Sequence, residues 1–312
     1  MRQTIGFGPL LLTHLILFCC FVCGLAAQEK PYRFEVRVQT VYVDVFVSHD
    51  GKPVRGLSAK DFEVSDNGVR QEIELVDVET VPTSAMLVLD TSGSVTGSKL
   101  RHLREAAHSF VDGLDEDDEA GLLTVTQELR LKKHLGRDFH GLHEALDQPM
   151  TGGATALADA LFAGLKLLER ARGRPLLLLF TDGMDNMSWL DASDALDVAE
   201  ASEAIVYVVG VGSQAGVRRL GRVRSTVSDE ATRFLDRIAK VTGGQVWYAD
   251  TTVLLEDVFL GVLEEMKMRY LLSYRPRGAL EEGWHALDVR LKSRKSAEVR
   301  SRSGYSVTRN RN

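Results

Sequence analysis

Two uninterrupted runs of apolar residues constrain the fold of this 312-residue chain more than any other feature. The runs occupy residues 85–89 and 175–180, and polar residues follow each of them at once. A strand that is apolar at every position has to be covered on both faces, which is typical of central strands in a parallel sheet. Strand-like and helix-like patterns alternate from residue 85 to about residue 268. The sequence therefore predicts a doubly wound α/β fold with a mostly parallel sheet.

Within this region we expect strands at residues 85–89, 120–126, 175–180, 204–209 and 245–248. We expect helices at residues 98–113, 155–172, 192–201, 229–242 and 252–267. The flanking segments have strand-like patterns instead, from residue 34 to about residue 79 and again after residue 269, at residues 270–274, 284–291 and 298–307. The C-terminal segment is too short to bury a core alone. We therefore expect it to pair with the N-terminal segment in a smaller β-rich module, with domain boundaries at 28–80, 84–268 and 269–312.

The first 27 residues have the pattern of a secretory signal peptide, with Arg2, an apolar block and two small residues at the end. The three cysteines, Cys19, Cys20 and Cys23, all lie in this segment, so the mature chain would contain no thiol. The alternative is an uncleaved anchor, since the apolar block approaches the ~20 residues that cross a bilayer. Both interpretations place the remainder outside the cytoplasm, either secreted or in the periplasm or cell envelope.

Charge and motif content exclude several classes of function. The chain has 38 basic and 44 acidic residues, a formal net charge of −6, so it lacks the positive field needed for non-specific nucleic-acid binding. It contains neither a G-x-S-x-G nor an H-E-x-x-H motif, and a mature chain without cysteine has no thiol nucleophile. The sequence thus favours a binding protein over an enzyme.

Three short segments carry oxygen-bearing side chains where strands are expected to end or a helix to begin. Asp90, Ser92 and Ser94 follow the first apolar run, Asp182 follows the second, and Thr155 stands after two glycines at the start of a helix. Ligands bind at the carboxyl edge of the strands in open α/β sheets. Carboxylate and hydroxyl oxygens suit a hard divalent cation, Mg²⁺ most naturally, or Mn²⁺ or Ca²⁺. We expect such an ion to keep one position open for a carboxylate of a partner protein.

With these segments the chain resembles the von Willebrand factor type A domains of bacterial secreted proteins, which carry a metal-ion-dependent adhesion site (MIDAS). The resemblance covers roughly residues 84–268. The positions of the family's metal-binding motif are filled here by Asp90, Ser92, Ser94, Thr155 and Asp182. The resemblance implies ligand binding rather than catalysis, and an aspartate at position 182 that reaches the ion through a water. Thr151 flanks the same glycines and stays an alternative to Thr155.

Other motifs are weaker. Residues 93–99 resemble a phosphate-binding loop, but the glycine spacing fails. Residues 210–215 match G-x-G-x-x-A, but an arginine-rich loop follows where a helix should begin. His140 and His143 could share a helix face as a metal pair, yet no third ligand is near, so we interpret them as surface histidines. The acidic run at residues 115–119 is expected to be a solvated turn.

The loop at residues 213–228 contains four arginines and no acidic residue in a chain that is otherwise net negative. Because it follows a parallel strand, we hypothesise that it borders the ion and steers acidic partners toward it; the alternative is a solvated loop without a role. The sequence leads us to expect metal-dependent protein binding. The alternatives are a structural or assembly factor whose metal stabilises the fold, and a hydrolase that uses the metal to activate water.

Overall fold

The computed structural model describes residues 40–76, 81–149, 152–182, 187–211, 230–249, 251–277, 282–293 and 296–307. The expected signal peptide and the arginine-rich loop at residues 213–228 lie outside this part of the chain. No helix among the described residues is both long and apolar enough to cross a membrane.

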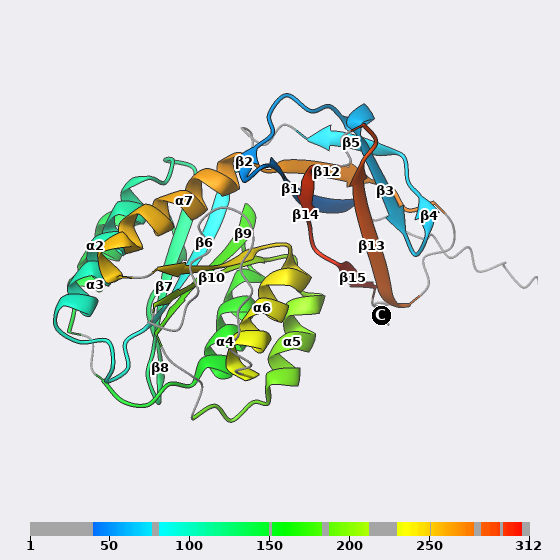
Figure 1. Cartoon of the computed structure of the whole chain (residues 1–312). Coiled ribbons are helices and arrows are strands. Elements are labelled where there is room, and N and C mark those ends of the chain that lie inside the picture. The colour runs from blue at the N-terminus through cyan, green and yellow to red at the C-terminus, as the bar shows by residue number, and fades with distance from the viewer. Residues whose placement is uncertain are drawn as a thin grey trace, which may run out of the picture. The chain divides into compact units, whose positions relative to one another are not determined.

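A six-stranded sheet in the order β11-β10-β9-β6-β7-β8 forms the centre of the α/β region (Figure 1). Its strands are β6 (Thr83–Asp90), β7 (Glu119–Val125), β8 (Leu129–Gly136), β9 (Arg174–Thr181), β10 (Ile205–Val211) and β11 (Gln245–Ala249). Neighbours are parallel except β7 and β8. Every residue of β6 is buried, since other strands flank β6 and helices cover both faces. The predicted doubly wound α/β fold is confirmed.

Two layers of helices cover this sheet (Figure 1). One layer contains α2 (Ser98–Asp112), α3 (Phe139–Asp147) and α7 (Leu255–Lys267), which follows the short helix η3 (Thr252–Leu254). The other contains α4 (Leu157–Leu168), α5 (Ala192–Ala201) and α6 (Glu230–Thr242). In α2, the buried residues Leu103, Ala106, Ala107 and Phe110 recur at three- and four-residue spacing. Each layer buries such a stripe against one face of the sheet.

The flanking segments form two smaller sheets. One contains β1 (Val41–His49), β2 (Lys52–Pro53), β5 (Ile73–Val76), β12 (Tyr270–Tyr274) and β14 (Glu298–Arg300). The other contains β3 (Phe62–Asp66), which follows η1 (Ala59–Asp61), β4 (Val69–Arg70), β13 (Gly283–Leu291) and β15 (Gly304–Val307). Because β1 pairs with β12 and β14, and β3 with β13, N- and C-terminal segments share one module, as predicted.

The structure differs from the sequence-based expectations in a few places. β8 and α3 were not expected, and the strand expected at residues 298–307 is interrupted to give β14 and β15. The acidic run at residues 115–119 is not wholly solvated: Asp118 and Glu119 are buried. Asp118 accepts a hydrogen bond of 2.7 Å from the backbone N–H of Thr83, so its carboxylate satisfies the first donor of β6.

Candidate metal centre

The residues predicted to bind a metal lie at the carboxyl edge of the two central strands. Asp90 is the last residue of β6, and Asp182 directly follows β9. The two strands are parallel neighbours in which Leu89 pairs with Phe180. Their carboxyl ends therefore bring two aspartates from distant parts of the sequence to the same place.

Asp90 is fully buried and is held by neutral donors. One carboxylate oxygen accepts the backbone N–H of Ser92 at 2.9 Å, and the other accepts the hydroxyl of Thr181 at 2.9 Å. Burial raises the pKa of Asp90; the hydrogen bonds from Ser92 and Thr181 lower it, and the nearby charge of Asp182 adds to the increase. No ion pair with Lys, Arg or His is found for Asp90 among the described residues. An ionised carboxylate here is costly unless a cation joins it.

A chain of hydroxyl groups links the motif to Asp182. The hydroxyl of Ser94 donates to Oδ1 of Asp182 at 2.7 Å, and the hydroxyls of Ser92 and Ser94 are 3.1 Å apart. A serine hydroxyl has one proton; Ser94 uses its proton on Asp182, and the hydroxyl of Ser92 also hydrogen-bonds to Asp90. Lone pairs on both serine oxygens stay available for a cation.

Lys99 neutralises the second carboxylate. Its ammonium nitrogen lies 2.8 Å from Oδ2 of Asp182. The side chain of Asp182 is only 1% exposed, whereas that of Lys99 is 42% exposed. Lys99 stands in the first turn of α2, within the segment that resembles a phosphate-binding loop. In the structure this lysine contacts Asp182, one of the candidate metal ligands.

The third segment packs against the first. The backbone N–H of Gly93 donates to the carbonyl of Gly153 at 2.9 Å, and a Cβ added to Gly152 would lie 3.0 Å from the Cα of Gly93. Thr155 is buried in the same loop, two residues before the start of α4. The structure thus joins Asp90, the two serines and Asp182 by hydrogen bonds and places Thr155 in the adjacent loop; Thr151 lies outside the described residues.

The donor set fits a hard cation by its chemistry. It offers two carboxylates and several hydroxyl groups, and it contains no thiolate or imidazole. Across the described part of the chain, no group of three or more His, Cys, Asp or Glu side chains is arranged to hold a metal. A metal at this edge would therefore depend on the serine and threonine oxygens as much as on the two aspartates.

The alternative motifs do not form a second site of this kind. His140 is exposed and lies 3.6 Å from Glu144 of its own helix, while His143 faces His108 of α2, with 2.6 Å between their Nδ1 atoms. His140 and His143 therefore do not form the metal pair that was considered, and His140 is a surface histidine as expected. Of the G-x-G-x-x-A segment, residues 212–215 lie outside the described residues.

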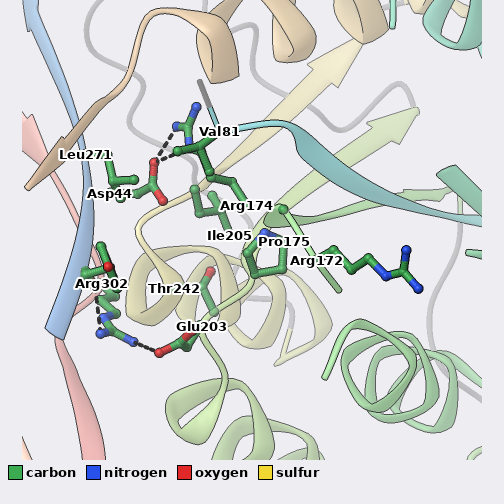
Figure 2. Close-up of a pocket in the computed structure, with 12 residues that line it drawn as sticks. Asp44, Val81, Arg172, Arg174, Pro175, Glu203, Ile205, Thr242, Leu271 and Arg302 are labelled. Carbon is green, nitrogen blue, oxygen red and sulfur yellow. Dashed lines mark hydrogen bonds and ion pairs between the residues drawn. The ribbon is translucent and has the colours of Figure 1, made fainter. Parts of the chain in front are cut away.

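A pocket lies at the opposite, amino-terminal edge of the same strands, where they meet the β-rich module (Figure 2). Arg174 at the start of β9 donates to Asp44 of β1, and Arg302 approaches Glu203 at 4.0 Å. The charged groups drawn here are largely paired with one another. The arrangement is typical of a junction between two parts of a fold rather than of a site that awaits a cation.

Two residues of the candidate centre were not identified from the sequence. Thr181 is the last residue of an apolar strand, next to Asp182, and no role was assigned to it from the sequence. Its hydroxyl donates a hydrogen bond to Asp90. Lys99 was considered only as a phosphate ligand. Two sequence patterns would have identified them. Thr181 is a polar residue at the last position of a central parallel strand, and Lys99 is a lysine in the first turn of the helix that follows such a strand.

Comparisons with known proteins agree with this fold. A family model for the von Willebrand factor type A domain matches residues 86–254, more than half of the chain. The inter-alpha-trypsin inhibitor heavy chain H4 of Sus scrofa is 25% identical over 220 residues, which cover 65% of this chain and 22% of that protein. The uncharacterized protein sll0103 of Synechocystis is 27% identical over 139 residues, covering 42% of this chain and 33% of that protein. The chain thus spans a third or less of these curated relatives.

Two solved structures share the fold. A von Willebrand factor type A protein from Catenulispora acidiphila gives a TM-score of 0.50 at 14% identity and covers 85% of this chain and 73% of its own. Proximal thread matrix protein 1 of the mussel byssus, with a zinc-occupied MIDAS motif, gives a TM-score of 0.51 at 16% identity, covering 66% of this chain and 50% of its own. Together with the family match, these findings show that the chain belongs to the von Willebrand factor type A domain family.

Proposed function

We propose that this chain is an extracytoplasmic protein-binding module that recognises an acidic group of its partner through a divalent cation. Asp90, Ser92, Ser94, Thr155 and Asp182 would hold the ion. Bound there, the ion would supply a positive centre that accepts one carboxylate oxygen from the partner. The N-terminal pattern of residues 1–27 supports a location outside the cytoplasm, and the proposal assigns the chain no catalytic role.

One observation carries the proposal: Asp90 is fully buried at a sheet edge, and the donors that hold it there among the described residues are hydroxyl and amide groups. Burying an ionised carboxylate costs several kcal/mol unless a positive charge accompanies it. A fold that merely needed a polar strand end could use a neutral side chain in this position. Because the partners of Asp90 are neutral, its negative charge is left for an exchangeable cation to compensate. The lone pairs of Ser92 and Ser94 supply further ligands.

The role of Mg²⁺ is tested first, by calorimetric titration and thermal unfolding of the wild type, Asp90→Ala and Asp90→Asn. At a Mg²⁺ concentration about 100 times Kd, the free energy of unfolding of the wild type should rise by about 2.7 kcal/mol. Neither variant should show that rise. Asp197→Ala is the matched control, because Asp197 is an exposed aspartate of α5. A wild type that binds neither Mg²⁺ nor Mn²⁺ nor Ca²⁺ would contradict the proposal.

The role of the carboxylate is tested by selecting displayed random peptides on the immobilised protein in Mg²⁺ and eluting them with EDTA. We expect the eluted peptides to share an Asp or Glu whose replacement by Asn or Gln abolishes binding. If Mg²⁺ raises the unfolding temperature but no chelator-sensitive peptide is selected, the alternative of a structural metal is correct and recognition is not.

A further inference from the structure

A tryptophan is displayed in solvent beside the candidate metal centre. The side chain of Trp189 is 94% exposed, and Met187, two residues earlier, is 49% exposed. The backbone N–H of Met187 donates to the carbonyl of Thr155 at 3.1 Å. These two apolar side chains therefore belong to a segment that borders the carboxyl edge of the sheet.

The backbone that carries Trp189 is clamped to the start of α4. The hydroxyl of Ser188 accepts the N–H groups of Ala158 and Asp159, at 3.0 and 3.3 Å. In return, the carboxylate of Asp159 accepts the N–H groups of Trp189 and Leu190, at 3.0 and 2.9 Å. Each segment's side chain accepts backbone N–H groups of the other, as in a capping box, but here the two segments are about thirty residues apart.

The next side chain fixes the segment further, since Leu190 packs against the hydrophobic core on that face of the sheet. Hydrogen bonds and packing thus fix the backbone on both sides of Trp189, while its indole is almost entirely in solvent. Large apolar side chains are usually at least partly buried, and a rigid Trp offers much contact area at low entropic cost to a partner. Trp is also enriched among the residues that dominate binding energies at protein interfaces.

The charges around this segment are compatible with an acidic partner. The carboxylate of Asp159 is occupied by backbone donors, and Asp182 is paired with Lys99. Lys99 neutralises Asp182, and a divalent ion at the candidate centre would add two positive charges at this edge. Positive charge and an exposed indole therefore lie on the same edge of the sheet.

We infer that Trp189, with Met187, is the apolar half of the partner-binding surface, and that the partner is a protein segment with an aromatic or aliphatic side chain close to its metal-binding carboxylate. This rests on the proposed function and specifies its ligand. A membrane surface is the less favoured occupant, because the chain has a net charge of −6 and anionic lipids attract basic surfaces.

The test repeats the peptide selection in Mg²⁺ with the wild type, Trp189→Ser and Trp189→Phe. Trp284→Ser is the matched control, since Trp284 lies in β13 of the β-rich module and is itself 40% exposed. Wild-type peptides should carry an aromatic or aliphatic residue at a fixed spacing from the acid. Trp189→Ser should bind these peptides at least tenfold more weakly with Mg²⁺ affinity unchanged, Trp189→Phe should retain part of the affinity, and Trp284→Ser should bind like the wild type.

The outcomes separate the two ideas. If the wild type selects acidic peptides without an apolar preference, or if Trp189→Ser binds them equally well, this inference is wrong and the proposed function stands. If no chelator-sensitive peptide is selected at all, both fail. Sedimentation with phosphatidylglycerol and phosphatidylcholine vesicles provides the third arm: binding that depends on Trp189 would assign the indole to lipid and overturn the inference.

Discussion

Two groups of buried charges lie at opposite edges of the central sheet, and they are neutralised in different ways. At the carboxyl edge, Asp90 is held by a hydroxyl and an amide, and the partner of Asp182 is a lysine that is 42% exposed. At the amino-terminal edge, the fully buried Arg269 contacts Glu265 of α7 and Tyr207 of β10. Arg300 donates to the other oxygen of Glu265 at 2.7 Å.

This difference distinguishes an edge that is closed by permanent cations from the edge that we propose is open to an ion. A guanidinium group stays charged at every accessible pH and presents several donors in a rigid plane. It therefore compensates the charge of a buried carboxylate without a metal ion. Hydroxyl groups are neutral and keep lone pairs that can face a cation. The amino-terminal edge therefore joins the α/β region to the β-rich module, whereas the carboxyl edge has the features of an exchangeable site.

The largest effect is expected from removing the arginine of the closed edge. Arg269→Met should lower the free energy of unfolding by about 3–5 kcal/mol, because it leaves buried polar partners without their cation. Urea denaturation measures this loss. Lys166→Met, which removes the exposed pair between Lys166 of α4 and Glu169 just after this helix, should cost at most about 1 kcal/mol.

The same variant tests whether the two edges are independent. Arg269→Met should bind Mg²⁺ within about twofold of the wild type, since it lies at the other edge of the sheet. If the variant does not fold, Arg269→Lys keeps the charge and replaces it in the comparison. A large loss of Mg²⁺ affinity in a folded variant would show that the junction takes part in the metal site and that the two edges are not independent.

A smaller effect is expected at the open edge from Asp182→Asn. If Asp182 reaches the ion through a water, its loss should weaken Mg²⁺ binding by about 10–100-fold, as for other groups that orient metal ligands indirectly. Asp90→Asn should abolish binding. Calorimetric titration of the two variants gives the comparison, and Asp197→Asn serves as the control. Equal losses at both positions would place Asp182 directly on the metal.

The sequence predicted the central strands and the motif because both are local patterns. A strand covered on both faces must be apolar throughout, as β6 and β9 are. β8 was missed because Lys, Arg and His separate its leucines, which is compatible with a half-buried strand beyond β7 as well as with a loop. α3 was missed because its nine residues include two histidines and a glycine, which weaken the helical signal.

Parts of the candidate site could not be predicted in this way. The contact between Lys99 and Asp182 joins residues 83 positions apart, and it depends on where the first turn of α2 lies relative to the end of β9. The exposure of Trp189 likewise depends on the clamp between Ser188 and Asp159. Such properties belong to the packing of distant segments and not to any spacing along the chain.

The smallest expected effect shows whether Lys99 stabilises the site or competes with the metal. Lys99 holds the carboxylate oxygen Oδ2 of Asp182 at 2.8 Å, and its positive charge would repel an entering cation. Because the lysine of this pair is 42% exposed, its charge is partly screened by solvent, so Lys99→Met should tighten Mg²⁺ binding only about two- to fivefold and slightly lower the melting temperature of the metal-free protein. Arg101→Met controls for the loss of a positive charge, because Arg101 faces Glu105 on the same helix. Weaker binding in Lys99→Met alone would mean that the lysine orients Asp182 for the metal, and the carboxyl edge would then carry a permanent cation as the amino-terminal edge does.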